Sequence, residues 1–507
     1  MSNKPGLDLV IAGGGTAGWM AAALLSRFLE DTARITLVES EDIGTVGVGE
    51  ATIPQIHAFN VALGLDEREF VRATNASYKL GIEFAGWLRP GHSYMHAFGT
   101  VGRGSGLIPF RHLWLRAKEL GVAEDLGCYS FNEVAARLGR MARPSGKPGP
   151  FPDLAYAYHF DASLYAAYLR RYAQARGVHR VEGLIEAVDR DGLSGDIIAL
   201  RLNKERRVAG SFFLDCTGFR SLLLGGALGV GFQDWSNFLP CDRALAVPCA
   251  RSEAFRPYTQ SLARQAGWQW RIPLQHRTGN GHVYCSRFIS DDEAAAVLLS
   301  NLDGEAQGEP RPIRFTAGRR DQMWSHNCVA LGLAAGFMEP LESTSIHLSQ
   351  SSLARLIKLL PAAPAGAQTR SAFNRLTAME WEQIRDFLVL HYRANQRVGE
   401  AFWDHCRELP MSESLAAKIA LYEESGGIVR EDGELFTEEA WSQVMAGQGL
   451  QAGSYSPLAR TVDRDDLAAY LAKLTEGYRR KAETLPSHAQ FVEAAAGKAA
   501  VPMTAAV

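Results

Sequence analysis

The sequence has no long apolar run. Within its 507 residues, no apolar stretch reaches the ~18 residues that a membrane span needs, so we expect no membrane partner. The opening "MSNKPGLDLVIAGGG" carries a lysine before an apolar stretch, as signal peptides do. That stretch is short, however, and leads into glycines without a cleavage-site pattern, which argues against secretion.

Cysteine is sparse and unpatterned. The seven cysteines are odd in number, scattered and free of any CxxC pair. This usage predicts reduced thiols in a cytoplasmic protein and gives no indication of a disulfide framework, a zinc site or another metal site.

An excess of charge of either sign is also missing. Lysine and arginine number 53 against 56 acidic residues, a net charge of −3. This balance favours neither nucleic acid nor an anionic membrane as a partner. With 47% hydrophobic and 21% charged residues, the composition is typical of a globular protein, and the length predicts two or three packed units.

The N-terminus contains a βαβ pattern. Residues 8–12 ("DLVIA") predict a buried strand, 16–29 a helix and 34–39 ("RITLVE") a second strand. The opening therefore indicates an α/β fold.

Turn residues divide the following region. Residues 143–153 ("RPSGKPGPFPD") carry four prolines and predict a loop. Residues 161–175 have helical spacing after an aspartate start signal, and 196–218 predict a hairpin that turns near 203–205.

Beyond a second breaker at 361–368 the sequence becomes helical. Two apolar stripes at helical spacing support this prediction: Phe373, Leu376, Ile384, Phe387, Leu388 and His391, then Leu467, Tyr470, Leu471, Leu474 and Tyr478. We expect a body over 1–360 with inserted substrate-site segments at about 76–150, a helical module over 369–485, and a loosely ordered tail over 486–507.

The loop after the first strand has the spacing of a dinucleotide site. "GGGTAG" supplies Gly13, Gly15 and Gly18 in GxGxxG spacing, with Thr16 and Ala17 between the last two. Glycines permit a tight turn and a close approach of pyrophosphate to the helix N-terminus. Glu39 ends the second strand, where a carboxylate can accept hydrogen bonds from ribose hydroxyls.

Two further strand-to-glycine turns favour a flavoprotein over a simple NAD dehydrogenase. They are "FLDCTGFRS" (213–221) and "CVALGLAAGFMEP" (328–340), and the second includes Gly332 and Leu333. We therefore predict that the dinucleotide is FAD.

Five segments carry a more specific pattern: "GVGEAT" (47–52), "ASYKLGIEFAGW" (76–87), "WQWRIP" (268–273), "EPLESTSI" (339–346) and "IRDFLVLHYR" (384–393). In combination, from about residue 6 to about 460, they resemble the flavin-dependent halogenases, whose best-known members are the tryptophan halogenases. The resemblance implies an FAD-binding body of the aromatic-hydroxylase type, with mixed sheets and a mostly helical C-terminal substrate module packed on it.

The resemblance also implies the chemistry. FADH2, delivered by a separate NAD(P)H-dependent flavin reductase, would react with O2 and oxidise bromide or chloride to hypohalous acid. That acid would then halogenate a small electron-rich aromatic substrate elsewhere in the protein. "GVGEAT", with Gly49, Glu50 and Ala51, is similar to the flavin-covering loop.

The resemblance assigns Lys79 and Glu342 to catalysis. Lys79 would hold hypohalous acid as an ammonium or form a haloamine as a neutral amine, and both readings stay open. Glu342 would polarise the halogen donor and help to remove the ring proton. Glu339 we interpret as structural.

Thr344 and Ser345 would bind halide through backbone N–H groups. The family usually has glycine where this chain has Ser345, and the added Cβ leaves the preference between chloride and bromide open.

Aromatic residues complete the expected site. Trp268 and Trp270, one residue apart, share a face if they lie on a strand, either as core or as a wall that keeps organic substrate from the flavin. Ile272 and Pro273 complete that motif. "MHAFG" resembles an HPFG segment in which Phe98 would stack on substrate with His96 beside it, although Ala97 replaces proline.

The C-terminal segment departs most from tryptophan-specific members. It shortens to "GELFTEEAWSQVMAGQG" (433–449), without the tyrosine-rich clamp that grips the amino acid. We therefore expect indole or a substituted indole as substrate, with free tryptophan as the alternative.

Two other functions remain as hypotheses. An FAD-dependent aromatic hydroxylase would have no need of Lys79 or Glu342. A flavin-binding redox sensor without turnover would need neither residue for binding alone.

Overall fold

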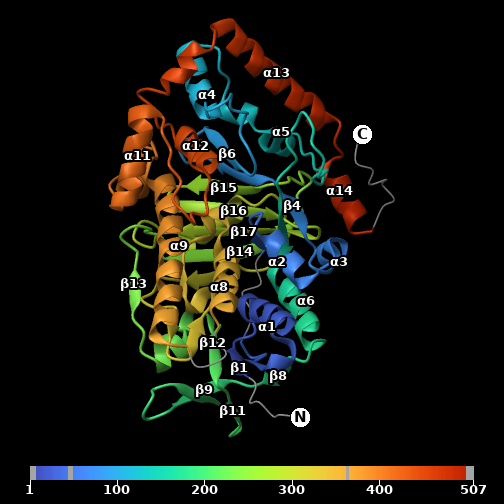
Figure 1. Cartoon of the computed structure of the whole chain (residues 1–507), viewed down its shortest axis with the longest axis vertical. Coiled ribbons are helices and arrows are strands. Elements are labelled where there is room, and N and C mark those ends of the chain that lie inside the picture. The colour runs from blue at the N-terminus through green and yellow to red at the C-terminus, as the bar shows by residue number, and fades with distance from the viewer. Residues whose placement is uncertain (1–6, 44–48, 361–364, 498–507) are drawn as a thin grey trace. The chain divides into compact units, whose positions relative to one another are not determined.

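The computed structural model describes residues 7–43, 49–360 and 365–497 (Figure 1). The chain divides into two compact units, each drawn from three stretches. Unit 1 comprises residues 1–75, 160–236 and 315–382, and unit 2 comprises 76–159, 237–314 and 383–507. The sequence predicts linear boundaries instead, with a break at about 361–368, of which 361–364 lie outside the described residues.

Unit 1 is built on the predicted βαβ pattern. The strand β1 (Leu7–Ala12) pairs in parallel with β2 (Ala33–Glu39) and with β12 (Phe212–Asp215), and α1 (Thr16–Leu29) follows β1. The six-stranded sheet has the order β20-β21-β12-β1-β2-β8. Its central strands β1 and β12 are mostly apolar, as strands covered on both faces usually are, with Asp8 and Asp215 as the polar exceptions. The helix α6 (Ala162–Gln174) lies beside α1 (Figure 1).

The remaining elements of unit 1 are as follows: η1 (Glu30–Thr32), β3 (Gly49–Ala51), α2 (Ile56–Leu63), α3 (Glu67–Ala73), β8 (His179–Glu182), β9 (Ile185–Arg190), β10 (Ile197–Leu202), β11 (Arg207–Ala209), η3 (Gly218–Arg220), η4 (Leu222–Ala227), β13 (Phe232–Asp234), β19 (Gly318–Arg320), β20 (Trp324–Ser325), β21 (Cys328–Ala330), η5 (Gly332–Ala334), β22 (Gly336–Phe337), η6 (Pro340–Glu342) and α8 (Ser345–Leu359). The helix α9 (Ala367–Arg393) begins in unit 1 and ends in unit 2.

Local predictions in unit 1 are confirmed. Asp161 caps α6, its carboxylate accepting from the backbone N–H groups of Ser163 and Leu164 at 3.0 and 3.1 Å. The hairpin predicted over 196–218 is the antiparallel pair β10–β11. It turns at Lys204 and Glu205, which have φ of +60° and +56°.

Unit 2 contains a seven-stranded sheet with the order β18-β14-β17-β16-β15-β5-β6. Its strands are β5 (Gly81–Ala85), β6 (Ser93–Ala97), β14 (Arg243–Ala250), β15 (Thr259–Arg264), β16 (Gly267–Pro273), β17 (Arg277–Tyr284) and β18 (Arg311–Arg314). The short strand β4 (Ser77–Lys79) lies outside this sheet and pairs antiparallel with residues 157–159 of β7 (Ala157–Asp161).

Helices supply most of the C-terminal part of unit 2. They are α10 (Ala401–Arg407), α11 (Glu413–Ser425), α12 (Glu438–Gly447), η7 (Pro457–Thr461), α13 (Arg464–Glu483) and α14 (His488–Ala495), and α4 (Phe110–Glu119), η2 (Leu126–Tyr129), α5 (Phe131–Arg137) and α7 (Asp291–Ser300) precede them in the chain. The mixed α/β architecture with a helical C-terminal part confirms the predicted fold class.

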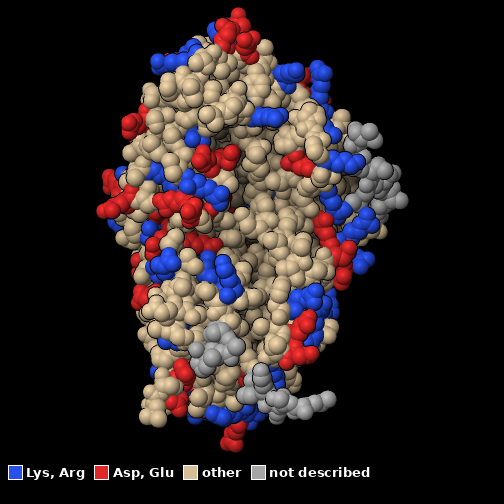
Figure 2. Space-filling view, in the orientation of Figure 1, with Lys and Arg blue, Asp and Glu red and all other residues tan. Residues whose placement is uncertain are grey.

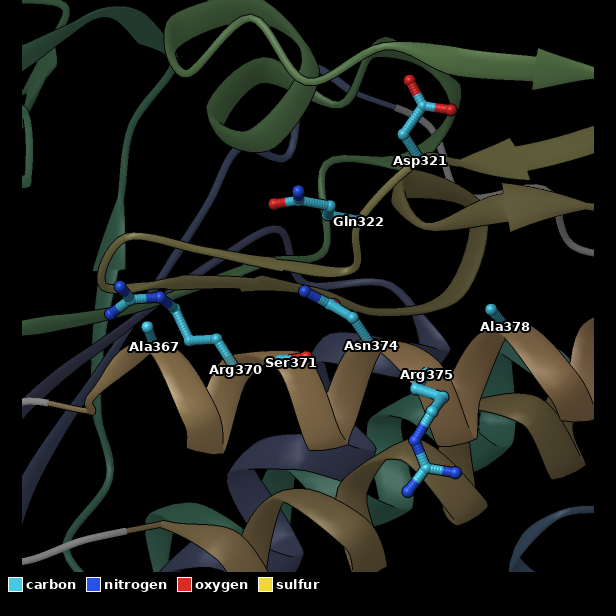
Figure 3. Close-up of a pocket in the computed structure, with 8 residues that line it drawn as sticks. All are labelled: Asp321, Gln322, Ala367, Arg370, Ser371, Asn374, Arg375 and Ala378. Carbon is cyan, nitrogen blue, oxygen red and sulfur yellow. The ribbon is translucent and has the colours of Figure 1, made fainter.

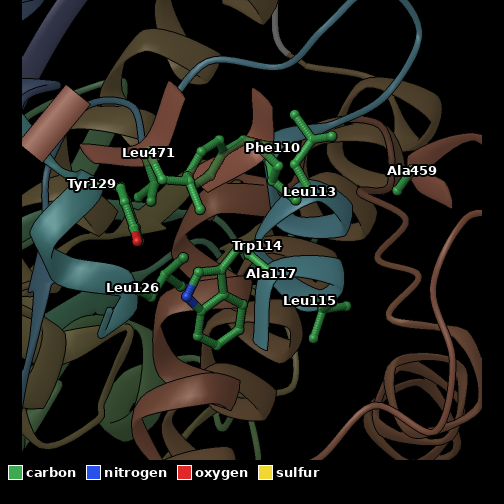
Figure 4. Packing of buried hydrophobic residues seen from close by; sticks show 11 residues of the cluster. Phe110, Leu113, Trp114, Leu115, Ala117, Leu126, Tyr129, Ala459 and Leu471 are labelled. Atoms are coloured by element: carbon green, nitrogen blue, oxygen red, sulfur yellow. The ribbon is translucent and has the colours of Figure 1, made fainter. Parts of the chain in front are cut away.

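An apolar core joins α4, η2 and α13. Trp114 and Phe110 of α4 pack with Tyr129 of η2 and Leu471 of α13, all nearly buried (Figure 4). The predicted stripe at 467–478 supplies the α13 side of this core. In the other predicted stripe, Leu376 is 37% exposed.

The loosely ordered tail predicted over 486–507 is wrong for residues 486–497, which include the helix α14, and 498–507 lie outside the described residues. Its start is fixed by a capping box in which Ser487 and Gln490 exchange side-chain and backbone hydrogen bonds. Phe491 and Val492 are buried. The alanine-rich composition concealed this helix because only a few large apolar side chains anchor it.

Acidic and basic side chains are interspersed on the face shown in Figure 2, in keeping with the net charge of −3. Among the helices of residues 7–43, 49–360 and 365–497, none combines the length and the apolar character that a membrane span requires.

Candidate active site

The glycine loop between β1 and α1 is tightly packed at Gly13 and Gly18. It has open space beside Gly15. A Cβ on Gly13, which has φ of +108°, would lie 2.2 Å from the carbonyl oxygen of Cys216. A Cβ on Gly18 would lie 1.9 Å from the carbonyl oxygen of Gly13. Gly15, at the N-terminus of α1, has nothing within 4 Å of its Cβ position. The loop therefore leaves open space beside Gly15 at a helix N-terminus, where an anion is stabilised.

The other two glycine turns meet this loop. Cys216, from the turn after β12, is the residue that contacts Gly13. Gly332, from the turn after β21, has φ of +59°, and a Cβ there would lie 2.8 Å from Cβ of Ala17. Leu333 follows in η5. Segments predicted separately from sequence thus converge in unit 1.

Asp215 organises the turn after β12, a role that sequence reasoning missed. It is fully buried at the end of β12. Its carboxylate accepts from the Thr217 hydroxyl at 2.6 Å and from the backbone N–H groups of Leu223 and Leu224 at 3.0 and 2.8 Å. Its position at the end of an apolar strand was the signal that could have identified it.

Glu39 ends β2 as predicted, but its carboxylate already has protein partners. Arg180 donates from Nε to Oε1 at 2.5 Å, and the Trp19 indole N–H donates to Oε2 at 3.2 Å. A carboxylate has about four acceptor positions, so these partners leave capacity for ribose hydroxyls. Arg180, on β8, was not identified from the sequence.

Gly49, Glu50 and Ala51 form β3, and Gly47 and Val48 of the same motif lie outside the described residues. Burial raises the pKa of the Glu50 carboxyl to about 7. Glu50 is therefore neutral over a range of pH in which an ordinary glutamate is charged.

Glu342 ends η6, Ser345 begins α8, and Thr344 lies in the turn that joins these two elements. Glu342 is 1% exposed and Thr344 is 2% exposed. The residue between them, Ser343, takes the left-handed conformation with φ of +60°. Ser345 is the first residue of α8, so serine replaces the usual glycine there without a positive φ. The strained position, Ser343, was not identified from the sequence.

Lys79 lies at the end of β4 and is fully buried. Its Nζ is 5.3 Å from the centre of the Phe98 ring. The backbone connects the same two segments, because the Phe98 N–H donates to the Leu80 carbonyl oxygen at 2.9 Å. The structure thus brings together the predicted lysine and one predicted aromatic residue within unit 2.

A buried histidine adjoins the lysine strand. His159 Nδ1 lies 3.1 Å from the Ser77 hydroxyl, and its Nε2 lies 2.8 Å from the Thr259 hydroxyl. Burial lowers the pKa of His159 well below its ordinary value, and the nearby charge of Lys79 lowers it further. The imidazole is therefore neutral.

Trp268 and Trp270 lie on β16 with ring centroids 6.2 Å apart, as two residues on one face of a strand should. Trp268 also packs against Trp87 in the core, which favours the packing interpretation for this residue. A Cβ on Gly281 would lie 2.0 Å from the Trp270 ring, so Trp270 covers a glycine on β17. Ile272 and Pro273 end β16, both nearly buried.

The departure at Ala97 has a structural explanation. The Ala97 N–H donates to Oε1 of Gln443 at 3.1 Å, and Gln443 Nε2 donates back to the Ala97 carbonyl at 3.1 Å. Proline has no N–H and could not make the first bond. Gln443 belongs to α12, within the shortened segment 433–449. His96, also on β6, packs on Phe387 with centroids 5.5 Å apart.

An open cavity of about 410 Å³ lies along the first turns of α9 (Figure 3). Asp321 and Gln322 face Arg370 and Asn374 across it. The Asn374 amide oxygen accepts from the backbone of Met323 and Trp324 at 3.0 and 2.8 Å, so this residue joins the loop to the helix. No predicted site residue lines the cavity.

The predicted residues are thus divided between the units. The flavin residues, Glu342, Thr344 and Ser345 belong to unit 1, and Lys79 and the aromatic residues belong to unit 2. In unit 1, the open backbone at Gly15 and the convergence of the glycine turns fit the pyrophosphate of a dinucleotide, and Glu39 fits a ribose. The fold and this cradle define a flavoprotein.

Comparison with known proteins identifies the kind of flavoprotein. The family model for tryptophan halogenases matches residues 8–464. Tryptophan 7-halogenase RebH from Lentzea aerocolonigenes is 34% identical over 97% of this chain and 99% of its own. A flavin-dependent halogenase from Xanthomonas campestris superposes with a TM-score of 0.94 at 45% identity, covering 98% of this chain and 100% of that one. A second, BrvH from Brevundimonas sp. BAL3, has a TM-score of 0.93 at 42% identity, covering 97% and 100%.

The chain belongs to the tryptophan halogenase family of flavin-dependent enzymes. It is therefore an oxidoreductase, and the predicted family is confirmed. Enzymes of this family use FADH2 and a halide, generally require a separate flavin reductase, and act on small aromatic substrates.

Proposed function

We propose that this enzyme uses O2 and bromide or chloride to halogenate indole or a substituted indole, with Lys79 and Glu342 as catalytic residues. The observation that carries the proposal is the fully buried Lys79, whose Nζ lies 5.3 Å from the Phe98 ring centre. Burial of an amine is costly, and a surface lysine would serve stability better. A buried lysine in a halogenase is therefore best explained by a reaction.

In the proposed reaction the flavin supplies the redox chemistry, and residues of this chain bind the halide and the flavin. When bound, reduced flavin supplies the oxidation of halide by O2 to hypohalous acid. Backbone N–H groups of Thr344 and Ser345 hold the halide at the start of α8, where the helix dipole favours an anion. The cradle of Gly13, Gly15 and Gly18 holds the pyrophosphate and Glu39 the ribose.

Lys79 acts in one of two ways. As an ammonium it donates a hydrogen bond to hypohalous acid, or as a neutral amine it takes the halogen from oxygen, so that an N–halogen bond replaces the O–halogen bond and the amine proton leaves with the hydroxyl group as water. Phe98 presents the face of its ring beside the amine, where a second aromatic ring can stack. Glu342 accepts the proton that leaves the ring carbon after halogen addition. Trp270 shields the substrate from the cofactor.

The segment 433–449 supports indole over free tryptophan. Two of its polar side chains, Gln443 and Glu434, are engaged by the protein itself. Gln443 bonds both backbone groups of Ala97, and Glu434 bonds Lys418 at 3.2 Å and the Trp441 indole at 2.7 Å. These two side chains are therefore not available to hold an amino acid's ammonium and carboxylate. Tryptophan remains the alternative because RebH, at 34% identity, is a tryptophan 7-halogenase.

The test is a substrate comparison. The purified protein would be supplied with FAD, a flavin reductase, NADH and either bromide or chloride, together with indole, substituted indoles or tryptophan. We expect the bromine isotope doublet in the indole products by mass spectrometry, with a higher kcat/KM for indole than for tryptophan. A higher kcat/KM for tryptophan would overturn the indole assignment. Hydroxylated product would favour a monooxygenase, and no product across the panel would favour a flavin-binding sensor.

A further inference from the structure

The helix α14 contacts the strand that carries Lys79, although it lies beyond residues 8–464 matched by the family model. The Tyr78 backbone N–H donates to Nε2 of His488 at 3.1 Å. The Tyr78 ring meets Phe491 edge to face, with centroids 4.9 Å apart at 74°. Both elements belong to unit 2, where Figure 1 shows them as neighbours. Residue 488 is thus one hydrogen bond from the residue preceding Lys79.

The hydrogen bonds of His488 define its tautomer. Nδ1 lies 3.0 Å from the carbonyl oxygen of Phe255, which can only accept, so Nδ1 carries the proton. Nε2 is then the acceptor that the Tyr78 N–H requires. The Phe255 ring stacks on the imidazole at 4.5 Å and 22°. The imidazole is therefore held at both nitrogens and on one face.

The residues around His488 are anchored in turn. The His488 N–H donates to the Gly139 carbonyl at 2.8 Å, and the Met141 N–H donates to the Pro486 carbonyl at 3.2 Å. Arg140 donates to the Leu485 carbonyl at 2.9 Å. These bonds join residues 485–488 to residues 139–141, which follow α5, and they fix the backbone that carries the imidazole.

The strand β4 depends on such side contacts because it is short. It has three residues and lies at one end of its sheet, with β7 on one side. An edge N–H that points away from the sheet needs another acceptor when it is buried, and Tyr78 is fully buried. His488 supplies that acceptor.

We propose that His488 is a positioning residue that fixes β4 and thereby places the Lys79 amine for halogen transfer. The inference rests on the proposed role of Lys79. Adjacent Cα atoms are about 3.8 Å apart, so a displaced Tyr78 amide moves the start of the lysine side chain with it. The Phe98 contact then changes, and hypohalous acid is no longer captured.

The test separates capture of the oxidant from its formation. His488→Phe keeps an aromatic ring for stacking and removes the acceptor, and His488→Gln restores an acceptor oxygen near the position of Nε2. Halogenated product per O2 consumed is measured by mass spectrometry, and escaping hypohalous acid is measured with a small-molecule trap. For His488→Phe we expect product per O2 to fall about 10- to 100-fold while trapped acid rises. For His488→Gln we expect halogenated product per O2 to return most of the way to the wild-type value.

Ser487→Ala is the matched control, because it weakens the capping box of α14 and leaves the imidazole in place. It should retain the wild-type product per O2. Should His488→Phe fail to fold, His488→Asn replaces it, since asparagine is polar but one methylene too short to reach the Tyr78 N–H. We then expect halogenated product per O2 to be highest in the wild type, somewhat lower in His488→Gln and far lower in His488→Asn.

Three results would overturn the proposal: unchanged product per O2 in folded His488→Phe, product and trapped acid falling in proportion, or an equal loss in Ser487→Ala. The variant Lys79→Ala shows whether the positioning role of His488 has failed or the proposed catalytic role of Lys79 has failed. If Lys79→Ala keeps its product, the catalytic role of the lysine fails. If Lys79→Ala loses product and His488→Phe does not, only the positioning role fails.

Discussion

The Ser77 hydroxyl donates a hydrogen bond to the carbonyl oxygen of Pro273, with 2.5 Å between the two oxygens. Ser77 lies two residues before the predicted catalytic lysine, and Pro273 is the last residue of the "WQWRIP" motif. Two motifs that are far apart in the sequence are therefore joined within unit 2. The lysine strand has one side-chain bond to this motif and another to His159.

Ser77→Ala should destabilise the protein, because it leaves a buried carbonyl and a buried imidazole nitrogen without their partner. Each unsatisfied group costs about 1–3 kcal/mol. We expect the free energy of unfolding, measured by urea denaturation, to fall by at least about 1 kcal/mol. Ser300→Ala, at an exposed helix end, is the control and should change it by less than about 0.5 kcal/mol. Equal effects of the two changes would contradict a role for the Ser77 bond.

Lys79→Ala should abolish ring halogenation while hypohalous acid still forms, because the proposed flavin and halide residues belong to the other unit. We expect kcat for indole halogenation to fall by about 10²–10⁴-fold, the range for loss of a positioned catalytic group. Product yield and trapped hypohalous acid are measured together. Lys473→Ala, at an exposed position on α13, should behave as wild type. Normal product from Lys79→Ala would remove this lysine from the mechanism.

Ala97→Pro should destabilise this chain even though it restores the residue usual in the family. The substitution removes the N–H that donates to Gln443. We expect a loss of about 1–3 kcal/mol in the free energy of unfolding. In a Gln443→Ala background, where that acceptor is already absent, the same substitution should cost less. Additive effects in this double-mutant cycle would mean that the two residues are not coupled.

The sequence predicted local structure correctly where a short pattern is compatible with only one backbone arrangement. Gly13, Gly15 and Gly18 predicted a strand-turn-helix, and the backbone at these positions permits nothing larger at Gly13 or Gly18. Trp268 and Trp270 predicted a shared face, because strand geometry alternates side chains. The strand order of the sheets and the discontinuous units were not predictable, since they depend on pairings between distant segments.

Residues that act through distant partners were missed. Asp215 accepts hydrogen bonds from a turn that follows it, and Arg180 reaches Glu39 from another strand. His488 lies in an alanine-rich region whose pattern predicted little order. Its partner, Tyr78, is 410 positions away in the sequence. Only the folded chain shows these relationships.

Ser345→Gly tests the halide site. Ser345 begins α8 with a helical backbone, so its Cβ rather than backbone strain is what distinguishes it from the usual glycine. Removal of the Cβ should widen the space beside the proposed halide, which favours the larger bromide. We expect the ratio of kcat/KM for bromide over chloride to rise a few-fold, measured by varying each halide at fixed indole. An unchanged ratio would place this side chain away from the halide.

The pH dependence of stability tests the buried imidazole of His488. Burial, the first cause, lowers the pKa of His488 to about 4, the hydrogen bond to Phe255 opposes this shift, and the charge of Arg251 adds to it. An unfolded histidine has a pKa of about 6.5. Below pH 6.5 the unfolded chain therefore binds a proton that the folded chain does not. The stabilisation is complete above pH 6.5 and is lost as pH falls towards 4, at about 1.4 kcal/mol per pH unit.

His488→Gln isolates this contribution, because glutamine does not titrate and other groups, such as Glu50, remain in both proteins. The difference in unfolding free energy between wild type and variant should narrow by about 2 kcal/mol between pH 7.5 and pH 5. Urea denaturation at both pH values measures it. Parallel pH profiles for the two proteins would show that His488 titrates alike when folded and unfolded. The imidazole could not then be held neutral between Tyr78 and Phe255.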